Sequence, residues 1–133
     1  MKKKITALVM AAAMCLSVAA CGSDNGGDTA KDTYTVGICQ LVQHVALDAA
    51  TQGFKDALTE KLGDKVTFDE QNAAGDSATC ATICNQFVSS NVDLIMANAT
   101  PALQAATAAT DSIPILGTSV TDYGTALDIA DWT

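Results

Sequence analysis

The sequence predicts an α/β domain built on a doubly wound parallel sheet with strand order 2-1-3-4. Segments rich in β-branched and apolar residues alternate with segments whose apolar residues recur at helical spacing. The strand segments are short and mostly apolar, as is typical of parallel strands that helices cover on both faces. Because crossovers between parallel strands are right-handed, this alternation favours a sheet that grows outward on both sides of its first strand.

A strand–helix–strand unit is predicted for the first half of the domain. Residues 34–39 form a short, β-rich run that makes the first strand. Residues 45–62 carry apolar side chains at helical spacing, and Gly63 follows at the position where a helix commonly ends. Residues 66–70 alternate between apolar and polar types, and this period of two predicts the second strand.

Two further helices and two further strands are predicted after a turn at residues 72–76. Asp76 or Ser77 can cap a helix that runs to Val88. Thr100 is predicted to cap the next helix, with Pro101 in its first turn. The remaining segments are, in order, a nearly all-apolar strand over 92–97, a helix that ends near Thr110, and a strand over 113–117.

The first 32 residues predict export and lipid anchoring. Three lysines precede a mostly apolar run, and Val18-Ala19-Ala20-Cys21 resembles the lipobox of bacterial lipoproteins. We therefore expect a signal peptide over 1–20, lipidation at Cys21, and a flexible polar tether over 21–32. An ordinary signal peptide with an incidental cysteine, or a short membrane helix, is the alternative. The apolar run is, however, well under the roughly 20 residues that a spanning helix needs.

The charge of the chain disfavours nucleic acid as a partner. The sequence holds seven basic residues, all lysines, against fifteen acidic ones. Three of the lysines lie in the predicted signal peptide, and its removal leaves a net charge of −11. Four scattered lysines make no basic patch, so we expect no binding to nucleic acid and no attraction to anionic lipid. Membrane contact should come from the lipid on Cys21 alone.

The cysteines of the folded region are predicted to be core residues. Cys80 and Cys84 lie four residues apart, a spacing that a metal pair could also have. They belong, however, to an apolar stripe at helical spacing together with Ile83, Phe87 and Val88. Cysteine behaves in such a stripe as a small hydrophobic residue. A buried helix face is therefore favoured over a metal site or a disulfide.

A ligand site is expected where the chain direction reverses between the first and third strands. Ligands of open parallel sheets bind there, beyond the carboxyl ends of the strands. The loops at that edge are residues 40–44, 98–100 and 118–122. The first loop has no glycine that would let the backbone approach a pyrophosphate, so a nucleotide site is not predicted. Amides and hydroxyls, a helix start for a carboxylate and Asp122 for an ammonium suit a small zwitterion or polar solute. Each of these residues could instead only cap a helix or a turn.

His44 is the sole histidine and lies four residues before Asp48. Such a pair could make half of a metal site, or a general base with its orienting carboxylate. A contact at the helix start and a hydrogen bond to a ligand are the alternatives, and both are favoured over metal binding or catalysis. No third ligand and no nucleophile is evident in the sequence. We therefore predict no enzyme activity, no metal site and no cofactor.

Several segments together resemble the ABC transporter substrate-binding lipoproteins of the tryptophan/tyrosine-uptake type. These segments are residues 34–44, 46–50, 53–54, 69–76, 93–101, 113–114 and 118–122. The resemblance implies a two-lobed, type I periplasmic-binding-protein fold, whose members trap a solute between the lobes and deliver it to a permease. The residues that the match directs to the cleft are Gln40, His44, Asn98, Thr100, Ser119, Thr121 and Asp122.

Members of that family are much longer than this chain, which reaches Thr133 shortly after the fourth strand. We therefore expect residues 33–133 to form a Rossmann-like part of the N-terminal lobe. The expected whole is an extracytoplasmic, lipid-anchored solute-binding protein of an ABC importer, which binds an amino acid or a similar small polar solute. The alternative is a lipid-anchored sensory or surface domain that uses the same fold without transport.

Overall fold

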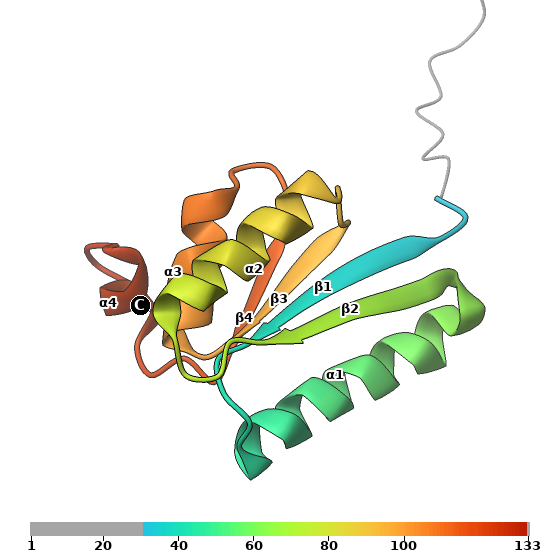
Figure 1. Ribbon diagram of the computed structural model, residues 1–133, viewed down its shortest axis with the longest axis horizontal. Coiled ribbons are helices and arrows are strands. Elements are labelled where there is room, and N and C mark those ends of the chain that lie inside the picture. The colour runs from blue at the N-terminus through green and yellow to red at the C-terminus, as the bar shows by residue number, and fades with distance from the viewer. Residues whose placement is uncertain (1–30, 133) are drawn as a thin grey trace, which may run out of the picture.

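The computed structural model describes residues 31–132 and contains one four-stranded parallel sheet in the order β2-β1-β3-β4. This confirms the predicted fold class and strand order. Strands and helices alternate along the chain (Figure 1). The elements are β1 (Tyr34–Gln40), α1 (Val45–Leu62), the 3-10 turn η1 (Gly63–Lys65), β2 (Val66–Asn72), α2 (Ser77–Ser89), β3 (Leu94–Asn98), α3 (Thr100–Ala109), β4 (Ile115–Thr118) and α4 (Tyr123–Leu127).

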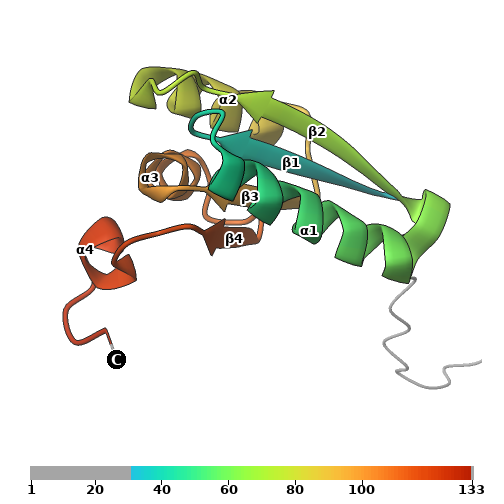
Figure 2. The same ribbon diagram turned by 90° about the horizontal axis from the view of Figure 1, so that it is seen from below.

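The sheet is covered on both faces, by α1 on one side and by α2 and α3 on the other (Figures 1 and 2). The α1 side buries Val36, Ile38 and Met96, against which Phe54 and Leu58 of α1 pack. The side of α2 and α3 holds the larger core cluster, which includes Phe87 and Ile95. The alternation of β1 between these two layers follows from the period of two in a strand, and it is why the strand is apolar on both faces.

Three free and fully buried thiols belong to the larger cluster: Cys39 on β1 and Cys80 and Cys84 on α2. This confirms the prediction that the cysteine stripe is a core face. The contact with Cys84 and the loss of water around the group raise the pKa of the Cys39 thiol, and burial raises the pKa of the Cys80 thiol. Within residues 31–132, no group of three histidine, cysteine or acidic side chains is arranged to hold a metal ion.

Several predicted boundaries differ from the structure for local reasons. β3 begins at Leu94 and not at Val92, because the Val92 amide bonds to the Phe87 carbonyl, at 3.3 Å, and so belongs to the connection after α2. β4 begins at Ile115, directly after Pro114, which has no N–H for a ladder hydrogen bond. The short helix α4 was not predicted. Asp76 caps α2, as predicted, by accepting from the Thr79 amide at 2.9 Å.

The predicted signal peptide over 1–20, Cys21 and nearly all of the tether lie outside the described residues. Within the described part of the chain, no helix combines the length and the apolar character that crossing a membrane requires.

Candidate functional site

A row of polar residues crosses the carboxyl edge of the sheet. The last residue of each strand is polar, and β1 sets the register: Gln40 pairs with Asn72 of β2 and with Asn98 of β3, which in turn pairs with Thr118 of β4. Because the strands are parallel, the loops that follow them all leave from this edge. The three loops in which the site was expected are therefore neighbours in space.

Backbone hydrogen bonds join these loops to one another. The Leu41 amide donates to the Asn98 carbonyl at 3.2 Å, and the Ala99 amide donates to the Thr118 carbonyl at 3.0 Å. On the other side, the Ala73 amide donates to the Gln40 carbonyl at 2.9 Å. The ladder thus continues for one residue beyond the strands, so that the loops start from fixed positions.

Two of the predicted site residues, Gln40 and Asn98, are buried, with 4% and 0% of their surfaces exposed. Both side chains point toward α1. Thr51 of α1 donates a hydrogen bond to Gln40 Oε1 at 2.7 Å and accepts one from Asn98 Nδ2 at 3.0 Å. Asn98 Nδ2 also donates to the Leu47 carbonyl at 2.8 Å. Their amides are therefore engaged with the first turns of α1.

His44 is exposed and forms the N-cap of α1, where its Nδ1 accepts a hydrogen bond from the Ala46 amide at 3.2 Å. An imidazole nitrogen that accepts carries no proton, so the neutral ring carries its proton on Nε2, which is left to donate. The carboxylate of Asp48 accepts instead from Gln40 Nε2 at 2.6 Å. His44 thus makes a contact at the helix start, and Asp48 bonds to Gln40 and not to His44.

The helix cap predicted at Thr100 is wrong by one residue. Ala99 occupies the N-cap position of α3, with φ 101° and ψ 160°, and no side chain caps this end. A non-glycine residue in that region of backbone space is strained, typically by about 1–3 kcal/mol. The strained residue stands between the end of the β3 ladder, where its amide donates to the Thr118 carbonyl, and the first residue of α3. The first amides of a helix have no intrahelical partners. Because Pro101 has no N–H, the amides of this kind within the first turn of α3 are those of Thr100 and Ala102.

The third loop follows β4 and carries Ser119, Thr121 and Asp122, all of which are exposed. Ser119 has a positive φ of 56°. Asp122 is the N-cap of α4, and its two oxygens accept from the Thr125 amide at 3.1 Å and from the Thr125 hydroxyl at 3.0 Å. These hydrogen bonds hold the pKa of Asp122 below its ordinary value. The group is therefore a carboxylate at neutral pH.

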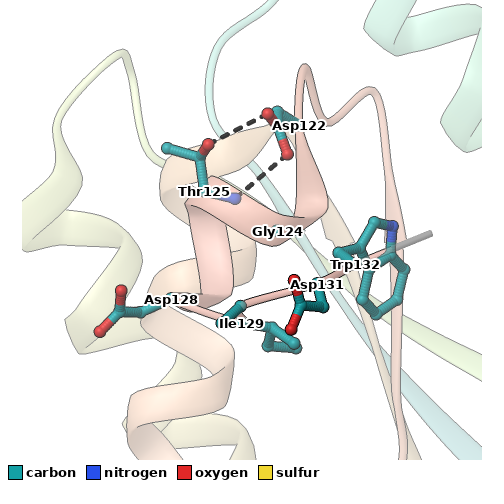
Figure 3. Close-up of a pocket in the computed structure, with 8 residues that line it drawn as sticks. Asp122, Gly124, Thr125, Asp128, Ile129, Asp131 and Trp132 are labelled. Carbon is teal, nitrogen blue, oxygen red and sulfur yellow. Dashed lines mark hydrogen bonds between the residues drawn. The ribbon is translucent and has the colours of Figure 1, made fainter.

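A hollow of about 400 Å³ adjoins this loop (Figure 3). Its lining comes from the N-cap of α4, from α4 and from the segment after it: Asp122, Gly124, Thr125, Asp128, Ile129, Ala130, Asp131 and Trp132. The Trp132 ring stacks on Tyr123, with ring centroids 5.9 Å apart. Of the seven predicted site residues, only Asp122 lines this hollow.

Sequence reasoning missed Thr51. It lies four residues after Leu47 and three before Phe54, and so it falls on the helix face that packs against the sheet. A hydroxyl on an otherwise apolar helix face was the signal that could have found it. Its partners lie 11 and 47 residues away, which no local pattern indicates.

The chain matches the model of a known protein family. The model of the family described as ABC transporter substrate binding protein matches residues 35–132, which is most of the chain and includes the loops after all four strands. The family is one of binding proteins and not of enzymes, and this confirms that part of the prediction. A tyrosine-binding protein of Clostridioides difficile, strain R20291, is 42% identical over 132 residues.

Solved structures of related proteins share the fold. A ligand-free, open substrate-binding protein with adhesive properties from Clostridium difficile is 44% identical, with a TM-score of 0.68. A conserved domain protein from Vibrio cholerae is 42% identical, with a TM-score of 0.69. An ABC domain in complex with L-Trp from Streptococcus pneumoniae is 35% identical, with a TM-score of 0.67.

The described fold corresponds to a part of these relatives. The match to the tyrosine-binding protein covers 90% of this chain and 38% of that protein. Each of the three structural matches covers 71% of this chain and 33% of the other. The chain thus spans about a third of the length of the proteins that it resembles.

Proposed function

Because the chain belongs to the family of ABC transporter substrate-binding proteins, we propose that it serves as a solute-binding component of an ABC importer. Substrate-binding proteins of ABC transporters are extracytoplasmic. The observation that carries the proposal is the family match over residues 35–132, a range that contains the whole carboxyl edge of the sheet. The partner of the loaded protein would be an ABC permease.

The solute that we propose is an amino acid with an aromatic side chain. Two relatives support this choice, one described as tyrosine-binding and one solved with L-Trp. The carboxyl edge offers matching chemistry: the uncapped start of α3 for the α-carboxylate, and the Asp122 carboxylate for the α-ammonium group. His44 Nε2 adds a hydrogen-bond donor at the same edge.

We assign two roles to the seven residues of the proposed site. The exposed or half-exposed ones would contact the solute: His44, Thr100, Ser119, Thr121 and Asp122. Gln40 and Asn98 are buried and bonded to α1, and they would act on the solute through the backbone of the loops that they hold.

Lipidation at Cys21 belongs to the same proposal. It would hold the domain at the outer face of the cell membrane, close to the permease, and the polar residues after Cys21 would act as the tether.

A second function is favoured by one observation, the adhesive properties ascribed to the relative from Clostridium difficile. In that case the chain would be a lipid-anchored surface domain that uses the fold without transport. The neighbouring genes separate the two proposals, because an adjacent permease and ATPase support import, whereas an adjacent adhesin or sensor kinase supports a surface role.

The binding proposal is tested by NMR titration of the complete chain with L-tyrosine and L-tryptophan, with L-alanine and L-aspartate as controls. Chemical shifts report weak as well as tight contacts. We expect the aromatic amino acids to shift the amides of residues 41–44, 99, 100, 102 and 119–122, and to leave the opposite edge of the sheet unchanged. Shifts spread evenly over the domain, or no shifts at all, would contradict the proposed site.

A further inference from the structure

We propose that Thr51 is a positioning residue, which sets the geometry of the candidate site by holding Gln40 and Asn98 against the start of α1. The inference rests on the function proposed above, since the loops that it positions are those assigned to the solute. Thr51 itself is 3% exposed and therefore cannot contact a solute.

A directional chain of hydrogen bonds runs through the Thr51 hydroxyl. Asn98 Nδ2 donates to Thr51 Oγ1 at 3.0 Å, and Thr51 donates onward to Gln40 Oε1 at 2.7 Å. Gln40 Nε2 in turn donates to the Asp48 carboxylate at 2.6 Å. Each donor polarises the next, and the chain ends on a charge, where hydrogen bonds are strongest. This chain joins the ends of β1 and β3 to the first two turns of α1.

The same side chains fix the loop after β1. Gln40 Nε2 also donates to the Val42 carbonyl at 3.0 Å, so the loop is held by the residue that precedes it. The Asn98 carbonyl accepts from the Leu41 amide at 3.2 Å. Any shift of Gln40 or Asn98 is therefore passed to the segment that ends in the His44 cap.

Two features, one at Asn98 and one at the next residue, indicate that the placement of the Asn98 side chain has been favoured over stability. Its Oδ1 atom is buried without a hydrogen-bond partner among the described residues. Exchanging the two amide atoms would not relieve this, because Oδ1 would then face the Leu47 carbonyl, which is also an acceptor. The next residue, Ala99, has the strained φ of 101°. Local conflicts of this kind concentrate at functional sites.

A purely structural role would not need a hydroxyl here. Phe54 and Leu58, on the same face of α1, pack against the sheet as apolar residues. Replacing a buried hydrogen-bonded group and its partners by apolar groups of the same shape is often neutral for stability. The polar residues occur instead where the loops begin, which is where a positioning role requires them.

Amide hydrogen exchange in the complete chain tests the inference, with Thr51→Val, Thr51→Ser and Thr59→Val compared. Valine keeps the shape of threonine and removes both hydrogen bonds, whereas serine keeps the hydroxyl. Thr59 is exposed on the same helix and provides the matched control. In Thr51→Val we expect the amides of Leu41 and Ala46 to exchange about tenfold faster relative to that of Ile95. Thr51→Ser and Thr59→Val should stay close to wild type.

Equal acceleration at every amide would show that Thr51 only stabilises the fold, and unchanged exchange at Leu41 and Ala46 would show that it does not hold the loop. Either result overturns the inference. If Thr51→Val does not fold, Asp48→Ala serves instead, because Asp48 is exposed and its loss removes the acceptor of Gln40. The same two amides should then exchange faster, and their failure to do so would likewise overturn it.

The solute gives a second readout. For whichever of L-tyrosine and L-tryptophan the wild-type chain binds, the dissociation constant should rise about tenfold in Thr51→Val and stay unchanged in Thr59→Val. An unchanged constant in Thr51→Val contradicts the positioning role. If the wild-type chain binds neither amino acid, the proposed function fails, and the exchange measurements still decide the role of Thr51.

Discussion

Gly37 of β1 lies against the ring of Phe87 of α2: a Cβ atom added to Gly37 would come within 2.7 Å of two ring carbons. Phe87 is fully buried and belongs to the larger core cluster, so its ring has little room to retreat. The absence of a side chain at Gly37 is therefore what lets α2 pack closely on β1. This contact sets the distance between the helix layer and the strand that feeds the first loop of the site.

Gly37→Ala should consequently destabilise the domain by about 1–3 kcal/mol, the usual cost of overpacking a core. Gly53→Ala is the matched control, because Gly53 lies inside α1 and a Cβ there meets nothing within 4 Å. That change should stabilise the domain by about 0.5–1 kcal/mol through helix propensity. Urea unfolding of both variants provides the measurement. Equal stability of Gly37→Ala and the wild type would contradict the packing described for Phe87.

The thiols of Cys39, Cys80 and Cys84 should resist alkylation until denaturant is added. All three are fully buried, and the raised pKa values of Cys39 and Cys80 keep those two groups protonated and unreactive at neutral pH. Mass spectrometry after iodoacetamide treatment counts the modified thiols. A Thr59→Cys variant adds a thiol at an exposed position of α1 and should react at once. Rapid labelling of the three core cysteines under native conditions would show that solvent and reagent reach the layer between α2 and β1.

Asp76 should make stability depend on pH in the acid range. Its hydrogen bonds to the Thr79 hydroxyl and amide lower its pKa in the folded state. The contribution is therefore present above the unfolded-state pKa of about 3.9 and is lost as the pH falls through the lower folded value. Asparagine still caps a helix but does not titrate, so Asp76→Asn should flatten this part of the curve. Urea midpoints measured from about pH 5 downward give the comparison, and identical pH profiles would rule out the role of Asp76.

The sequence predicted the elements whose signals are local. The helix predicted over 45–62 has the same bounds as α1, because its apolar spacing and Gly63 mark the two ends in the sequence. The start of β3 was placed two residues early because Val92 is apolar and buried, and only its hydrogen bond to Phe87 shows that it lies in the connection. The five residues of α4 are too few to display helical spacing.

The candidate site was predictable in place but not in detail. Strand order and parallel direction are enough to bring the three loops to one edge. The burial of Gln40 and Asn98 could not be foreseen, because their buried partner, Thr51, is brought to them only by the tertiary fold. The cap at Thr100 failed for a related reason, since Ala99 bonds to β4 in the tertiary fold and takes the N-cap position with a strained backbone that its residue type does not suggest.

Cys21→Ala should abolish acylation and release the chain from membranes, because Val18-Ala19-Ala20-Cys21 supplies the predicted lipobox. Membrane fractionation measures the release, and mass spectrometry of the mature protein measures the acylation. Cys15→Ala, within the predicted signal peptide, is the control and should leave anchoring unchanged. An unmodified wild-type chain that is cut at another position would refute lipidation at Cys21.

Calorimetric titration of wild type and Thr100→Val with an aromatic amino acid, in the complete protein, tests the solute site most directly. The hydroxyl and the amides at the start of α3 are proposed to bind the solute carboxylate, and a hydrogen bond to a charged group is typically worth about 1.5–3 kcal/mol. Affinity should therefore fall about 10- to 150-fold. The melting temperature should hardly change, because the Thr100 side chain caps no helix amide. Intact affinity with reduced stability in Thr100→Val would contradict the account and place the solute elsewhere.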